Sequence, residues 1–105
     1  MGAPSTPGDA TWIHTFFDTG AWTNPGGDFA AAPSAVLSVG AVGFFTWSSA
    51  QMVADVQAWL DDPSTNFGWM VRGAEGLAST RRFDSRENPT AAFRPRLTVR
   101  FQPAP

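Results

Sequence analysis

The chain has 105 residues, enough for one small domain with its own core, and its length gives no reason to expect a second domain. Hydrophobic residues make up 43% of the chain and charged residues only 15%, a composition that excludes intrinsic disorder over most of its length. The net charge of -2 and the lack of Lys argue against a nucleic-acid partner, and no apolar run reaches the roughly 20 residues that membrane insertion requires.

The first predicted elements are a linker and a strand. Residues 1–10 are rich in Pro and Gly and show no periodicity, which is typical of a linker. Residues 11–17 (TWIHTFF) are mostly β-branched or aromatic and predict a strand with Trp12 and His14 on one face. Asn-Pro and Gly-Gly within residues 23–29 predict a turn, and two further strands are expected at 34–40 and 42–47.

One helix is predicted near residues 49–61. Met52, Val56 and Trp59 belong to an apolar stripe with helical spacing, which indicates one face packed on the rest of the domain. Ser48, with Gln51 three residues later, fits a capping box at the start of this helix. Pro63 should end it.

The remaining chain predicts three more strands, at residues 67–72, 79–83 and 96–101, followed by a tail at 102–105. The predicted fold class is therefore all-β, with about six strands and one short inserted helix in a single domain over residues 11–101.

The second half of the sequence also resembles a known family. The order DVQAWLDDPSTNFGWMVRG, then RRFDSREN, then RPRLTVRF is similar to the C-terminal part of the disaggregatase-related DNRLRE domains. The matching positions include a helix, a turn, an F-x-S-R-E segment and a last strand: Asp55, Val56, Trp59, Asn66, Gly68, Phe83, Ser85, Arg86, Glu87, Pro95, Leu97 and Val99. The resemblance implies a jelly-roll-like β-sandwich from a secreted or cell-surface protein, and a polysaccharide as the partner.

The resemblance also implies that several N-terminal strands of such a domain have no counterpart here. Sheets without those strands would leave an apolar face and unpaired strand edges in water. We therefore expect a homodimer, because two-fold pairing would cover the same surface on both chains.

Six residues are candidates for carbohydrate binding. Trp22 lies in a loop rich in Gly, Asn and Pro and is the first choice for stacking on a sugar ring, with Trp12 and His14 as second choices. Asp28, Arg86 and Glu87 could supply hydrogen bonds to hydroxyl groups. For the segment around Ser85, however, a structural role is favoured, with Asp84 pairing with Arg86 on one face of a strand.

Catalysis has little support in the sequence. His14 is the only His and there is no Cys, which excludes a two-His metal site and a Cys nucleophile, so no catalytic residue and no metal ligand are assigned. A structural calcium ion bound by Asp18 or Asp28 stays open, although the ligands lack regular spacing. The predicted function is a non-catalytic carbohydrate-binding module. The alternatives are a self-assembly module without glycan binding and, less favoured, a small polysaccharide-active enzyme.

Overall fold

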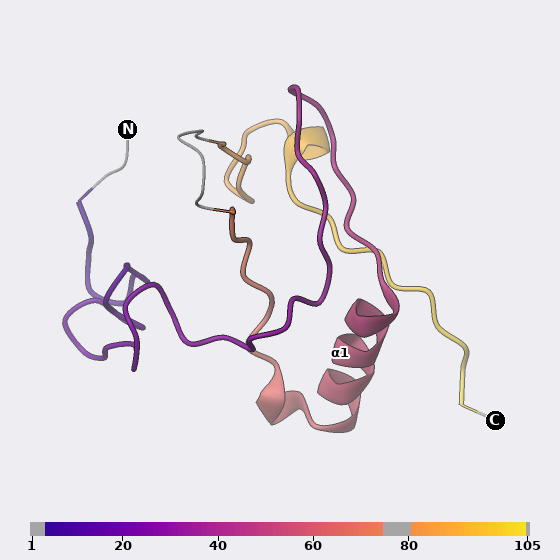
Figure 1. The fold of residues 1–105 in the computed structure, drawn as a ribbon, viewed down its shortest axis with the longest axis horizontal. Coiled ribbons are helices and arrows are strands. Elements are labelled where there is room, and N and C mark those ends of the chain that lie inside the picture. The colour runs from indigo at the N-terminus through magenta and orange to yellow at the C-terminus, as the bar shows by residue number, and fades with distance from the viewer. Residues whose placement is uncertain (1–3, 75–80, 105) are drawn as a thin grey trace. The chain divides into compact units, whose positions relative to one another are not determined.

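The computed structural model describes residues 4–74 and 81–104 (Figure 1). The chain divides into two compact units, Met1–Val71 and Arg72–Pro105, here called the N-terminal and C-terminal units. The N-terminal unit contains helix α1 (Ala50–Asp61) and the short 3-10 helix η1 (Pro63–Thr65). The described residues of the C-terminal unit contain one short 3-10 helix, η2 (Ala91–Phe93).

Helix α1 confirms the helix expected near residues 49–61, but its cap differs by one position. Ser49, not Ser48, is the N-cap, and its hydroxyl oxygen accepts a hydrogen bond of 3.0 Å from the backbone N–H of Met52. The helix ends at Asp61, and Pro63 occupies the first position of η1, where a missing N–H costs nothing. Asp62 caps η1 by accepting a hydrogen bond from the N–H of Ser64.

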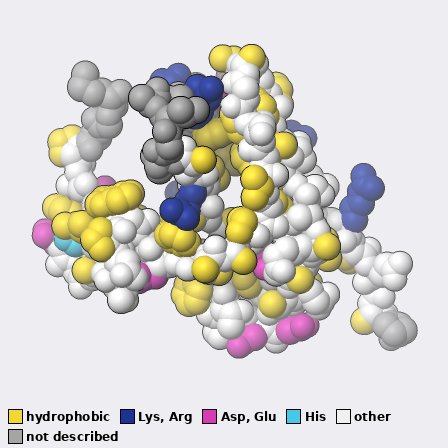
Figure 2. All heavy atoms as spheres, in the orientation of Figure 1, with side chains coloured by type: hydrophobic (Ala, Val, Ile, Leu, Met, Phe, Trp, Pro, Cys, Tyr) yellow, Lys and Arg dark blue, Asp and Glu magenta, His cyan; other side chains and the backbone are white. Residues whose placement is uncertain are grey.

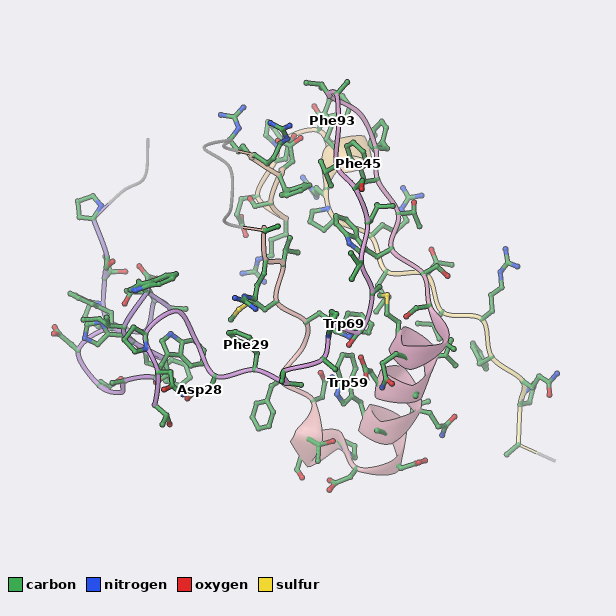
Figure 3. All side chains as sticks on the ribbon, in the orientation of Figure 1. Asp28, Phe29, Phe45, Trp59, Trp69 and Phe93 are labelled. Carbon is green, nitrogen blue, oxygen red and sulfur yellow. The ribbon has the colours of Figure 1, made fainter. Side chains whose placement is uncertain are left out.

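Asp55 links helix α1 to two other segments of the N-terminal unit. Its Oδ2 atom accepts hydrogen bonds from the hydroxyl of Ser34 and, at 2.8 Å, from the indole Nε1 of Trp69. Trp69 in turn packs against Trp59 of the helix, with ring centroids 4.7 Å apart (Figure 3). The hydroxyl of Ser49 donates to the carbonyl of Ser34 at 2.5 Å, so the start of the helix is tied to the same segment.

The predicted all-β sandwich is wrong, and so is its jelly-roll form. Within the described ranges the backbone forms no sheet, and its only strand-like pairing is one isolated antiparallel bridge between Phe16 and Gly20. The segments expected as strands at 34–40, 42–47, 67–72 and 96–101 have no ladder. The start of the strand expected at 79–83 lies outside the described residues. High β-propensity gives an extended segment, but a strand also requires a partner across a ladder.

The strand expected at residues 11–17 is a series of turns. The hydroxyl of Thr11 accepts hydrogen bonds from the backbone N–H groups of Ile13 and His14, and the N–H of Thr11 donates to the carbonyl of His14. Such local bonds compete with a ladder for the same backbone groups. Asp18 then adopts a left-handed conformation, with φ of 66°, and turns the chain back on itself.

The C-terminal unit is held by short-range hydrogen bonds. The F-x-S-R-E segment forms a turn, in which the N–H of Asn88 donates to the carbonyl of Ser85 at 3.1 Å. Arg94 closes the following loop by donating from Nε to the carbonyl of Asn88 at 2.7 Å. Residues 95–104 follow without a helix or a strand.

Most hydrophobic side chains lie at the surface, as Figure 2 shows for one face of the molecule. Of the described residues only Gly27 is buried, and none of the large hydrophobic side chains is. The accessible surface is 9608 Å². A compact protein of the same mass, 11.2 kDa, would expose about 5,700 Å². The chain on its own therefore buries much less surface than an ordinary domain of its size.

Candidate functional site

Four of the six predicted sugar-binding residues belong to one hydrogen-bonded loop. This loop, residues 11–28, is called the Trp12 loop here. It is closed by backbone hydrogen bonds from the N–H of Trp22 to the carbonyl of Ile13 (3.1 Å) and from the N–H of Gly26 to the carbonyl of Trp12 (2.7 Å). Trp12, His14, Trp22 and Asp28 are thus brought together by the fold of the loop itself.

Trp12 is the most exposed aromatic residue of this loop. The residue is 72% exposed, yet one edge of its ring is fixed against Gly26. A Cβ atom at position 26 would lie 2.9 Å from Cη2 of Trp12, and Gly26 has φ of 94°. Only glycine meets both conditions without strain, because it has no Cβ and tolerates positive φ. The ring is therefore held in place while much of it stays open to solvent.

Trp22, the first choice from the sequence, is less exposed than Trp12. It is half-buried, and its indole Nε1 donates a hydrogen bond of 2.9 Å to the carbonyl of Thr11. The polar end of the indole is therefore engaged in holding the two sides of the loop together. Less of its ring is therefore open to solvent than that of Trp12, which is 72% exposed.

Of the two ring nitrogens of His14, only Nδ1 has a hydrogen-bond partner among the described residues. Its Nδ1 lies 2.9 Å from the hydroxyl of Thr11, and its ring meets Phe17 edge to face with centroids 5.2 Å apart. The Thr11 hydroxyl already accepts from two backbone N–H groups, so its own hydrogen is left to point at Nδ1. A neutral ring with its proton on Nε2 would satisfy this hydrogen bond and would leave Nε2–H as a donor.

Asp28, shown in Figure 3, is used by the loop itself. Its two carboxylate oxygens accept hydrogen bonds from the backbone N–H of Thr23 (2.8 Å) and of Asn24 (3.0 Å). These bonds, that from Thr23 first, lower the pKa of Asp28 from its usual value, because they favour the charged form. The carboxylate thus fixes the turn that carries Gly26 and Gly27.

A contact with Met70 connects the Trp12 loop to the rest of the N-terminal unit. A Cβ atom at Gly27 would lie 2.7 Å from Cε of Met70, and Gly27 has φ of 113°. The neighbouring Trp69 is bonded to Asp55, so the loop is anchored near the helix.

Arg86 and Glu87 lie in the C-terminal unit and pair with each other. The Nε atom of Arg86 lies 2.7 Å from Oε1 of Glu87, and their side chains are 90% and 77% exposed. The pairing of Asp84 with Arg86 expected from strand alternation is replaced by this contact between neighbours in a turn. Exposed pairs of this kind contribute little to stability.

The part of the chain that the structure describes contains no candidate metal site and no candidate membrane span. No three His, Asp or Glu side chains gather there where they could hold a metal ion. In the same ranges no helix has the length and apolar character needed to cross a bilayer.

Sequence reasoning missed the hydrogen bonds of Thr11 and Asp55, which organise the structure. A Thr three residues before a His is a signal for a local turn that could have been weighed against β-propensity. The partners of Asp55 at positions 34 and 69 have no such local signal.

No family model, curated protein or solved structure matches the chain. The likeness to DNRLRE domains therefore stays a prediction.

Proposed function

We propose that the chain is a non-catalytic carbohydrate-binding module whose binding site is the Trp12 loop. The observation that supports this proposal best is the Trp12 ring, which is fixed at one edge by Gly26 and is 72% exposed. A flat apolar surface of this kind fits the C–H face of a pyranose ring. Because the ring is already held in place, binding would cost little additional side-chain entropy.

The polar groups around Trp12 suit hydroxyl groups of a sugar. The Nε2–H of His14 is a donor, while the carboxylate of Asp28 keeps lone pairs beyond the two that accept backbone N–H groups. Arg86 and Glu87 belong to the other unit and are not required by this site. In this proposal Trp22 and Asp28 shape the loop and Trp12 carries most of the stacking energy.

Titration calorimetry and affinity electrophoresis against soluble xylan, β-glucan and alginate test the proposal. Trp12→Ala should weaken binding to the retained polysaccharide by about tenfold or more, equivalent to about 1.4 kcal/mol. Phe67→Ala is the matched control, because Phe67 is an aromatic residue of the same unit that is 92% exposed. This control should bind like the wild type.

Two further variants separate the platform from its support. Gly26→Ala places a methyl group against the Trp12 ring and strains the backbone, so it should weaken binding while Trp12 is still present. Glu87→Gln should have no effect. Retention by none of the polysaccharides, or unchanged binding by Trp12→Ala, would overturn the proposal.

A further inference from the structure

Electric charge is divided unequally between the two units. Residues 1–71 contain no Arg or Lys and six carboxylates, namely Asp9, Asp18, Asp28, Asp55, Asp61 and Asp62. Residues 72–105 contain all seven Arg and three carboxylates, Glu75, Asp84 and Glu87. The formal charges are therefore -6 and +4, which together give the net charge of -2.

Part of this charge is available for a partner. Arg86 is paired with Glu87, and Arg94 donates to a backbone carbonyl. Arg82, Arg96 and Arg100, by contrast, are exposed and make no hydrogen bond or ion pair with any residue that the structure describes. Arg96 and Arg100 flank Leu97 and Val99, which are themselves exposed, so charge and apolar surface occur together on this segment.

The N-terminal unit has a corresponding surface on helix α1. Val53 and Leu60 lie seven residues apart, on one face of the helix, and are 70% and 66% exposed. Asp61 and Asp62 end the same helix, and its last turn contains no basic residue. The C-terminal end of helix α1 is therefore acidic and lies on a helix with exposed apolar side chains. The segment around Leu97 and Val99 is basic and also has exposed apolar side chains, so the two surfaces are complementary.

The exposed area is large enough for a second chain as the occupant. The surface of 9608 Å² exceeds that of a compact protein of this mass by about 3,900 Å². A stable protein interface needs about 800 Å² from each partner. Two copies therefore have more than enough surface for such an interface.

We propose that two copies of this chain form a reciprocal dimer, in which the acidic N-terminal unit of each copy binds the basic C-terminal unit of the other. A two-fold axis makes both contacts equivalent and closes the assembly. Opposite charges provide the orientation, since like units would repel each other. The proposal does not depend on glycan binding by the Trp12 loop, so either one can fail alone.

Sedimentation of the full chain at micromolar concentration gives the first test. The wild type should be a dimer at low salt and should dissociate at least about tenfold more readily as NaCl rises from about 0.05 M to about 0.5 M, because salt screens exposed charges. A monomer under all these conditions would overturn the proposal. So would a mass that keeps growing beyond the dimer as the concentration rises.

Charge reversal in two variants supplies the decisive test. The first variant makes the N-terminal unit basic (Asp9→Arg, Asp18→Arg, Asp61→Arg and Asp62→Arg) and leaves Asp28 and Asp55 in place. The second makes the C-terminal unit acidic (Arg82→Glu, Arg96→Glu and Arg100→Glu). Each variant alone should be monomeric, because both of its units then have the same sign.

An equimolar mixture of the two variants should restore a dimer, because each unit of one variant meets a unit of opposite sign in the other. A restored dimer would show that each variant is folded and that, alone, it fails only to pair. Tagging one variant shows whether the dimer contains both chains. If the mixture stays monomeric, or if either variant alone dimerises like the wild type, the proposal is wrong.

Discussion

At the scale of single residues, Asp28 shows how a candidate ligand can serve the loop that contains it. Sequence reasoning selected its carboxylate for hydrogen bonds to a sugar. In the structure both oxygens accept backbone N–H groups, from Thr23 and Asn24, which would otherwise lack partners in a tight turn. The charge of Asp28 therefore stabilises the loop that positions Trp12. Protonation of Asp28 at low pH should weaken these hydrogen bonds and destabilise the loop.

The pH dependence of the Trp12 loop is our prediction at this scale. The pKa of Asp28 in the folded chain lies below the usual 3.8, so its contribution to stability is complete above that value. The contribution should decline as the pH falls below 3.8, and disappear as the pH passes the lowered pKa. Amide exchange of Thr23 and Asn24, followed by NMR, measures this. In Asp28→Asn this acid-dependent step should be missing, and its persistence would contradict the assignment.

At the scale of elements, helix α1 depends on Asp55 for its connections. The helix has its own N-cap at Ser49 and forms from local signals. Its orientation toward the segments around Ser34 and Trp69 comes from Asp55, whose pKa is lowered by hydrogen bonds from Ser34, then Trp69, then Gln51. The formation of the helix and its contacts with the rest of the unit therefore depend on different residues.

We predict that Asp55→Ala weakens the tertiary contacts of helix α1 without unfolding the helix. The variant loses the acceptor for the indole of Trp69, so the packing of Trp69 on Trp59 should loosen and the near-UV circular dichroism should decrease. The far-UV helix signal should change much less, because the N-cap is intact. Asp61→Ala is the control, since within the described residues Asp61 accepts only from Gln57 of the same helix. Equal effects of the two substitutions would argue against a special role for Asp55.

At the scale of the whole molecule, the large accessible surface is the dominant physical property. An ordinary domain of this mass buries about 10,500 Å² on folding, whereas this chain, with 9608 Å² exposed, buries about 6,600 Å². Many large hydrophobic side chains contribute to the exposed surface, and such side chains are costly to leave in water.

Urea unfolding of the monomer should reflect this smaller buried area. The slope of unfolding free energy against urea concentration scales with the area exposed on unfolding, so we expect about 60% of the slope of a compact domain of equal length. The measurement belongs at a protein concentration where sedimentation shows a monomer. A slope equal to that of a compact domain would show that the monomer buries an ordinary core.

The sequence by itself determined the features that depend on neighbouring residues. Helix α1 was predicted near its observed position because a cap, a stripe of helical spacing and Pro63 lie within a few turns of each other. The turn at residues 23–29 was predicted for the same kind of reason, since Gly26 and Gly27 adopt positive φ there. The grouping of Trp12, His14 and Trp22 in one loop was not predicted, because residues 11–17 were expected to form a strand.

Only the tertiary structure decided whether apolar extended segments find partners. Residues 34–40, 42–47 and 96–101 have the composition of strands, but a ladder depends on a second segment at the right distance and register, which composition does not encode. The same holds for the different environments of Trp12 and Trp22. Both are aromatic residues of one loop, and only the structure shows that Trp22 donates a hydrogen bond to the carbonyl of Thr11, while Trp12 contacts Gly26 and stays 72% exposed.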